Sequence, residues 1–179
     1  MNDLSFKSQH NIVKIQNLKK AIINNINLID HTGKKFGSQT LKNQPSLIFF
    51  GFTHCPEICP TTLSQLSEIT DKLKSNIMTT NIIFITLDPQ RDTQEHLKDY
   101  MSNFNENVIG ITGEIMDIKK LADNWGVFFE RISSSKDDYT FNHTATVFML
   151  DKKGNYKGTI SWGENENSII QKVVNLSKY

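Results

Sequence analysis

Two apolar runs of strand length, each followed by a helical pattern, constrain the fold of this chain more than any other feature. The runs "SLIFFGF" (46–52) and "NIIFITLD" (81–88) are apolar almost throughout, which is typical of strands buried on both faces of a parallel sheet. After the first run, Leu63, Leu66 and Ile69 recur at helical spacing. Because strands alternate with helices, the pattern predicts right-handed crossovers and a three-layer α/β domain.

Shorter patterns extend this core toward both ends of the chain. A strand over 25–30 with a return at 35–36 predicts a hairpin near the N-terminus. Near the C-terminus, "TATVFMLD" and "YKGTISW" flank the turn "KKGN" and predict a second hairpin, before a final helix in "NSIIQKVVNLSKY". These hairpins predict a mixed central sheet. Between them we expect a helix capped by Asp92 with Glu95 three residues on, a strand "NVIGIT", a helix ended by Gly126, a strand over 127–132 and a polar loop "SSSKDDYTFN".

The composition fits one globular domain with a single substantial core. The chain has 179 residues, of which 37% are hydrophobic. Its 20 basic and 19 acidic residues leave a net charge of +1 and form no basic tract, so we expect no nucleic-acid partner. The first twenty residues show neither the apolar segment nor the cleavage site of a signal peptide. We interpret residues 1–24 as a leader, either flexible or left from a membrane-tether linker, ahead of a domain at 25–179.

Both cysteines lie in "GFTHCPEICPTTL", where the first apolar run meets the helical pattern. We expect Pro56 and Pro60 in the first turn of the helix and Cys55 and Cys59, four residues apart, on one helix face. That spacing puts the thiols within reach of either a disulfide or one metal ion, and a helix N-terminus favours thiolates. Inert burial is the plain alternative, because cysteine is among the most buried residue types.

A metal site needs a third donor, and the five histidines of the chain supply candidates. His143 is the strongest, because it ends the polar loop just before "TATVFML", and in a thioredoxin-like arrangement that loop faces the cysteine-bearing end of the helix. We interpret His10, His31 and His96 as surface residues and His54 as a structural residue of the turn.

Four motifs carry a resemblance to a known family: "FFGFTHCPEICPTTL", "ITLDPQRDT", "VIGITG" and "FNHTATVFMLDKKG". In this order and spacing they resemble the Sco/SenC family of copper-binding, thioredoxin-fold assembly factors for cytochrome c oxidase. The resemblance implies an α/β, thioredoxin-like three-layer fold with a central mixed sheet and an added N-terminal hairpin. It also implies that Cys55, Cys59 and His143 bind one copper ion, and that the two cysteines form a redox-active disulfide. Two thiolates and one imidazole suit Cu(I), and imidazole with thiolate also holds Cu(II).

Three further residues are expected to support this site or to dock a partner. Asp88 and Arg91, in "DPQRDT", follow a parallel strand at the edge where open α/β sheets bind ligands. Their structural alternative is a strand end at Pro89 with a solvated arginine. The residue before the ligand histidine is usually Asp in the resembling family and is Asn142 here, which bears on the tuning of the site or on docking more than on its existence.

The leading hypothesis is a copper chaperone that delivers copper to, or reduces the cysteines of, the dinuclear copper centre in a cytochrome c oxidase subunit. Other copper or thiol carriers are the further expected partners. An exposed CxxxC pair used as a disulfide suits an oxidising compartment. We therefore expect the domain to face the periplasm or the intermembrane space, anchored to the inner membrane by a segment absent from this chain.

Two other hypotheses stay open. One is a thiol:disulfide oxidoreductase or thiol peroxidase, with copper incidental, in which Cys55 attacks and Cys59 resolves. No proline lies near His143 to serve as the cis-proline of a general thioredoxin-like reductase, which argues against this reading. The other is a redox-inert zinc site with an open position, for which the sequence offers no catalytic base.

Overall fold

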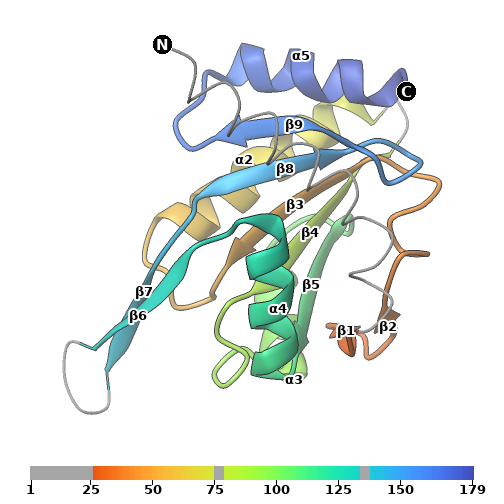
Figure 1. The fold of residues 1–179 in the computed structure, drawn as a ribbon. Helices are drawn as coiled ribbons and strands as arrows, with labels where there is room; N and C mark the ends of the chain where they lie inside the picture. The colour runs from red at the N-terminus through yellow and green to blue at the C-terminus, as the bar shows by residue number, and fades with distance from the viewer. Residues whose placement is uncertain (1–25, 75–78, 134–137) are drawn as a thin grey trace, which may run out of the picture.

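The computed structural model describes residues 26–74, 79–133 and 138–179 (Figure 1). The predicted leader, residues 1–24, lies outside the described residues. In chain order the elements are β1 (Leu28–Asp30), β2 (Lys35–Phe36), β3 (Ser46–Gly51), α2 (Ile58–Leu73), β4 (Asn81–Thr86), α3 (Gln94–Met101), β5 (Val108–Gly113), α4 (Ile115–Trp125), β6 (Phe129–Ser133), β7 (Tyr139–His143), β8 (Thr146–Leu150), β9 (Tyr156–Ser161) and α5 (Glu166–Ser177).

Seven of these strands form one mixed sheet in the order β2-β1-β5-β4-β3-β8-β9. Strands β3, β4 and β5 are parallel, whereas β1 pairs with β5 and β8 pairs with β3 in antiparallel fashion. The hairpins β1–β2 and β8–β9 form the two edges. The predicted mixed sheet with an N-terminal hairpin is confirmed. The remaining strands, β6 and β7, pair only with each other and project from the body of the domain (Figure 1).

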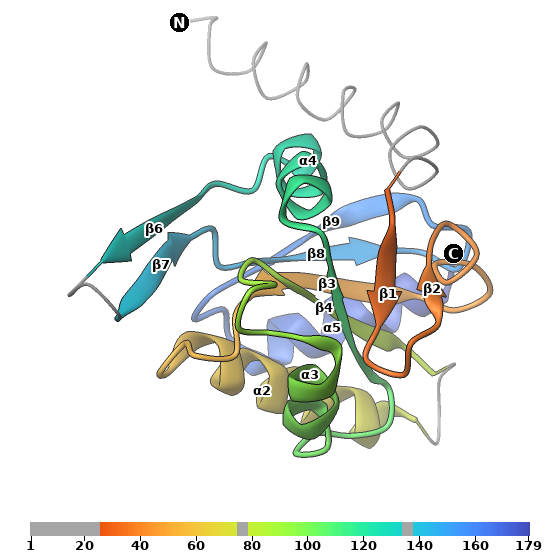
Figure 2. The ribbon, with the colours of Figure 1, turned by 90° about the horizontal axis from the view of Figure 1, so that it is seen from below.

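Helices cover both faces of the main sheet and complete three layers. Figure 2 shows α4 on one side of the sheet and α2, α3 and α5 on the other, and two core clusters fill the spaces between the layers. Strand β3 is buried along its whole length. Its neighbours Phe49 and Phe50 enter different clusters, because successive side chains of a strand point to opposite faces. This two-sided burial explains the continuous apolar run.

The predicted helix cap at Asp92 is wrong. Helix α3 begins at Gln94, and the Thr93 side chain accepts a hydrogen bond from the His96 N–H group. The Asp92 carboxylate is instead fully buried and accepts hydrogen bonds from the Thr53 N–H group and the Thr86 hydroxyl. Threonine is a favourable N-cap residue, so Thr93 caps the helix. The Asp92 carboxylate instead bonds to Thr53, just after β3, and to Thr86, the last residue of β4.

The predicted polar loop over 133–142 is also partly wrong, because its second half forms β7. This strand pairs with β6, with Phe129 opposite His143. Tyr139, Phe141 and His143 are half-buried and alternate with exposed residues. The polar composition of the segment hides this period-two pattern in the sequence.

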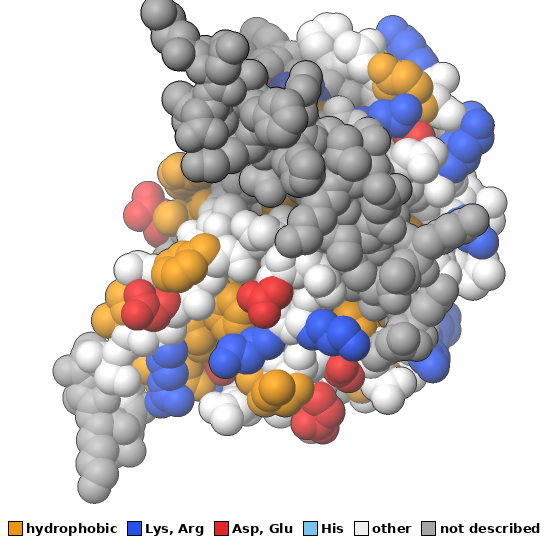
Figure 3. All heavy atoms as spheres, in the orientation of Figure 1, with side chains coloured by type: hydrophobic (Ala, Val, Ile, Leu, Met, Phe, Trp, Pro, Cys, Tyr) orange, Lys and Arg blue, Asp and Glu red, His pale blue; other side chains and the backbone are white. Residues whose placement is uncertain are grey.

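The surface of the domain fits its small net charge. On the face shown in Figure 3, lysine and arginine side chains lie beside aspartate and glutamate side chains. Among the helices that the structure describes, none has the length and apolar character that a membrane crossing requires.

Candidate metal centre

The two cysteines lie on either side of the start of α2. Cys59 is in the first turn and fully buried, whereas Cys55 lies in the segment after β3 and is 9% exposed. The predicted shared helix face is therefore wrong: Glu57 is the N-cap, so Pro56 and Cys55 precede the helix. The sulfurs still meet, because the Cys59 backbone N–H group donates to the Cys55 sulfur over 3.4 Å. The N-cap residue Glu57 makes no side-chain hydrogen bond to the helix, and the Cys55 sulfur accepts one from the first turn instead.

Hydrogen bonds make the two thiols unequal. The Cys59 side chain donates to the Cys55 sulfur and, with smaller contributions from backbone N–H groups, holds the pKa of Cys55 well below its usual range despite partial burial. The same bond and the burial of Cys59 raise the pKa of Cys59. Both cysteines are free rather than disulfide-bonded. At neutral pH the pair therefore holds one thiolate and one thiol.

His143 closes the group from the end of β7. Its Nε2 atom lies 3.7 Å from the Cys59 sulfur, and its Nδ1 atom lies 3.1 Å from the Thr144 carbonyl oxygen. A carbonyl only accepts, so Nδ1 carries the proton and Nε2 turns its lone pair toward the sulfur. The Phe52 ring meets the imidazole edge-on at 5.7 Å. Donor atoms of Cys55, Cys59 and His143 all lie within 4.8 Å of one another.

Gly51, the last residue of β3, leaves the space in which the Cys59 sulfur packs. A Cβ atom at this position would lie 2.8 Å from that sulfur and 2.7 Å from the Phe84 ring, closer than such atoms approach without displacement. Gly51 is not among the site residues predicted from the sequence. Its signal is a glycine inside an otherwise apolar strand, which often marks a close approach.

Asp88 and Arg91 do not join the three donors but hold the strand that carries His143. Arg91 Nε donates to the Asp88 carboxylate, and Arg91 Nη1 donates to the Tyr139 carbonyl over 3.1 Å. The Tyr139 hydroxyl donates to the other Asp88 oxygen over 2.9 Å. Asp88 is buried to 2% exposure. These bonds tie the first residue of β7 to the loop after β4, and the sequence did not reveal Tyr139, because it falls in the predicted loop.

Asn142 points away from the three donors. It is exposed, and it precedes His143 in a strand whose side chains alternate between faces. The residue directly opposite it in β6 is Glu130. Asn142 therefore lies on the outer face of the hairpin, where a docking role fits and a direct contact with the donors does not.

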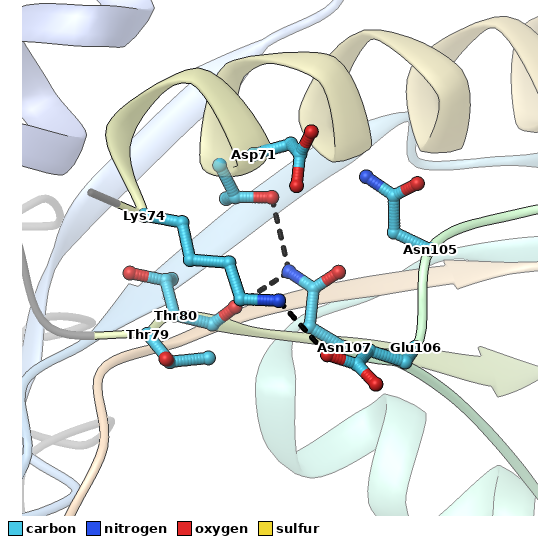
Figure 4. Close-up of a pocket in the computed structure, with 8 residues that line it drawn as sticks. Asp71, Lys74, Thr79, Thr80, Asn105, Glu106 and Asn107 are labelled. Carbon is cyan, nitrogen blue, oxygen red and sulfur yellow. Dashed lines mark hydrogen bonds and ion pairs between the residues drawn. The ribbon is translucent and has the colours of Figure 1, made fainter.

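A small polar pocket at the other end of the domain carries no comparable chemistry. It lies between the C-terminal end of α2 and the segments that lead into β4 and β5 (Figure 4). Its Asn107 amide donates to the Thr70 hydroxyl and the Thr80 carbonyl, and Lys74 pairs with Glu106. Because these groups form hydrogen bonds and an ion pair with one another, we interpret the pocket as a structural feature and not as a binding site.

The three-donor group suits two kinds of chemistry. Two sulfurs and one imidazole nitrogen favour a soft or borderline metal ion. Adjacent cysteines, one of them a thiolate, also suit disulfide exchange. In the part of the chain that the structure describes, the His, Cys, Asp and Glu donors grouped at this point are these three.

Comparisons with known proteins agree with this site and fold. The sequence model of the SCO1/SenC family matches residues 15–178. A SCO2-like protein of Rickettsia prowazekii is 43% identical over 131 residues, which cover 72% of this chain and 64% of that protein. This chain therefore spans less than two thirds of the length of that relative.

Solved structures show the same fold. ScoI of Bradyrhizobium japonicum with copper bound has a TM-score of 0.75 and 32% identity, over 86% of this chain and 96% of that one. ScoI of Arabidopsis thaliana with copper bound has a TM-score of 0.81 and 30% identity, over 88% of this chain and 99% of that one. The predicted thioredoxin-like fold is thereby confirmed. With the family match across most of its length, the chain belongs to the SCO1/SenC family.

Proposed function

We propose that this protein is a copper chaperone that binds one copper ion through Cys55, Cys59 and His143. The observation that carries the proposal is the convergence of these donors within 4.8 Å in a chain of the SCO1/SenC family. Copper-bound structures of two relatives with the same fold support it.

The donors match both oxidation states of copper. Thiolates are soft ligands that select Cu(I), and imidazole also suits Cu(II). On binding, Cys59 gives up its proton, and two thiolates with Cu(I) carry a net charge of −1. The N-terminus of α2 lies at this point and favours negative charge. The protonated Nδ1 of His143 keeps Nε2 available to the ion.

The cellular role that we propose is assembly of the dinuclear copper centre of cytochrome c oxidase. In this role the protein exchanges copper or electrons with an oxidase subunit and with other copper or thiol carriers. A cysteine pair used as a disulfide suits an oxidising compartment, so we propose that the domain lies on the periplasmic or intermembrane-space side, attached to the inner membrane. In cells that lack the protein, the wild type should restore oxidase activity and the His143→Ala variant should not.

An anaerobic Cu(I) titration against a competing chelator tests copper binding directly. The reduced protein should bind one Cu(I), and His143→Ala should bind it at least about tenfold more weakly, since loss of even an outer-shell partner costs about 10- to 100-fold. His31→Asn is the matched control, because His31 lies in the β1–β2 turn and its ring only accepts a hydrogen bond from the Gly110 N–H group. Equal affinities of wild type and His143→Ala would refute the three-donor site.

A second candidate function, disulfide exchange, is favoured by the lowered pKa of Cys55, whose buried side chain keeps 9% of its surface exposed. The Cys55 thiolate would attack a partner disulfide, form a mixed disulfide and release one partner thiolate. Cys59 would then attack the Cys55 sulfur and release the second, so that the partner gains two electrons and this pair becomes a disulfide. Reduction of a model disulfide at an undiminished rate in His143→Ala would favour this function over copper handling.

A further inference from the structure

A second group of metal-binding side chains comes from the loop before Cys55, the segment between β4 and α3, and the first turn of α3. Donor atoms of His54, Asp92 and His96 all lie within 4.8 Å of one another. We propose that these three residues form a second metal site, with two nitrogen donors and one oxygen donor, for a borderline divalent ion of the Zn(II) or Cu(II) class. The proposal does not depend on copper binding at the cysteines.

Both imidazoles point at one atom, the hydroxyl oxygen of Thr53. His54 Nδ1 lies 3.1 Å from it and His96 Nε2 lies 2.9 Å from it, and the two rings are stacked at 5.7 Å. The single hydroxyl proton is taken, because Thr53 donates it to Asp92 Oδ1 over 2.5 Å. The two ring nitrogens therefore converge on one point beside the Asp92 carboxylate, as ligands of one ion must.

The buried carboxylate supplies a charge for such an ion to neutralise. Asp92 is fully buried, and among the described residues no lysine or arginine forms an ion pair with it. The basic side chain beside it is that of His54, whose Nδ1 lies 3.9 Å from Asp92 Oδ1. The negative charge of Asp92 contributes to raising the pKa values of Cys59 and Tyr100. An unpaired buried charge is costly, so a divalent cation next to Asp92 Oδ1 would be bound favourably.

The three side chains combine a fixed donor with two adjustable ones. Hydrogen bonds from the Thr53 N–H group and the Thr86 hydroxyl hold the other oxygen of Asp92 in place. His54 and His96 are exposed, so their rings can close on an ion that arrives from solvent. Imidazole and carboxylate suit Zn(II) and Cu(II), whereas two thiolates with imidazole suit Cu(I). The two groups therefore select different ions.

Zinc titration of a thiol-free variant tests the proposal. In a Cys55→Ser/Cys59→Ser background the first group loses both sulfurs, so binding there does not mask the second. We expect one Zn(II) per chain, with the ring resonances of His54 and His96 shifting together in NMR spectra. Adding His96→Ala to this background should lower the Zn(II) affinity at least about tenfold, since loss of even an outer-shell partner costs about 10- to 100-fold.

Matched variants make the test decisive. His31→Asn in the same background removes a histidine outside the group and should leave Zn(II) affinity unchanged. His143→Ala in that background should also leave it unchanged, because His143 belongs to the first group. His96 is exposed, so its removal should not unfold the chain, and far-UV circular dichroism checks this. Failure to bind Zn(II), equal affinity in His96→Ala, or a shift of the His143 ring in place of the other two would overturn the proposal.

Discussion

His143 Nε2 lies 3.7 Å from the sulfur of Cys59, while the same ring is bonded through Nδ1 to the backbone carbonyl of Thr144. The orientation of the ring thus depends on where the chain runs at the end of β7. The position of that strand depends in turn on the bonds that join Tyr139 to Asp88 and Arg91. This connection makes the third donor sensitive to changes far from the sulfurs.

Replacing Arg91 with methionine should weaken Cu(I) binding by about tenfold, the lower end of outer-shell effects. The guanidinium groups of Arg91 and Arg131 stack on the Tyr139 ring at 3.7 and 3.6 Å, but the hydrogen bonds to Asp88 and the Tyr139 carbonyl come from Arg91. Arg131→Met is therefore the control and should leave the affinity unchanged. Chelator competition measures both variants, and an equal loss in the two would show that stacking, not the bonds, holds β7.

Gly51→Ala should destabilise the protein by about 1–3 kcal/mol, the usual cost of overpacking a core, and should also weaken Cu(I) binding. The added methyl group would lie 2.8 Å from the Cys59 sulfur. Gly110→Ala is the matched control: this glycine is also buried in a strand, but its Cβ would meet the flexible Met101 side chain at 3.0 Å. Urea unfolding gives the stabilities. If both variants bind Cu(I) as the wild type does, Gly51 serves packing alone.

The alkylation rate of Cys55 should depend little on pH in the neutral range. Its pKa is lowered to about 4, mainly by the hydrogen bond from Cys59, so the thiolate is the main form at pH 7 and persists as the pH falls until that value is approached. An ordinary thiol, with a pKa of about 8.5, would lose about tenfold in rate for each pH unit below it. Iodoacetamide labelling read by mass spectrometry measures the profile.

His143→Ala should leave the fall in the Cys55 rate close to its wild-type pH, because the hydrogen bond from Cys59 is the main cause of the lowered pKa. A rate that already drops tenfold per unit below pH 8 in the wild type would contradict the thiolate assignment.

Asn142→Asp should leave Cu(I) affinity unchanged and destabilise the hairpin slightly. The new carboxylate would lie directly across from Glu130, and like charges opposite each other cost about 0.2–1 kcal/mol. Thr140→Asp is the control, since Thr140 is exposed on the same strand but faces Ile132. Unfolding curves and chelator competition check both. A changed Cu(I) affinity in Asn142→Asp would show that the residue acts on the metal site itself.

The sequence predicted the elements whose burial leaves a periodic pattern. Strands β3 and β4 are covered on both faces, so their apolar runs identify them, and the order of elements brings His143 toward the cysteines. Strand β7 was missed because it lies outside the main sheet and one of its faces is polar.

Contacts between distant segments left no periodic pattern. The packing of Gly51 against Cys59, the bonds of Tyr139 and the group around Thr53 depend on side-chain distances across the fold. His54 and His96 are exposed, yet their stacking depends on how the loop after β3 meets helix α3. Partners and compartment remain predictions.

The separation of 84 residues between Cys59 and His143 also bears on folding. An unfolded chain already offers two sulfurs four positions apart, whereas the imidazole arrives only after the β3–β8 pairing closes a long loop. A metal that also binds the unfolded chain stabilises the native state only by its excess affinity for it. Copper should therefore raise the melting temperature less than its tight binding alone would suggest, and the histidine would account for much of the gain.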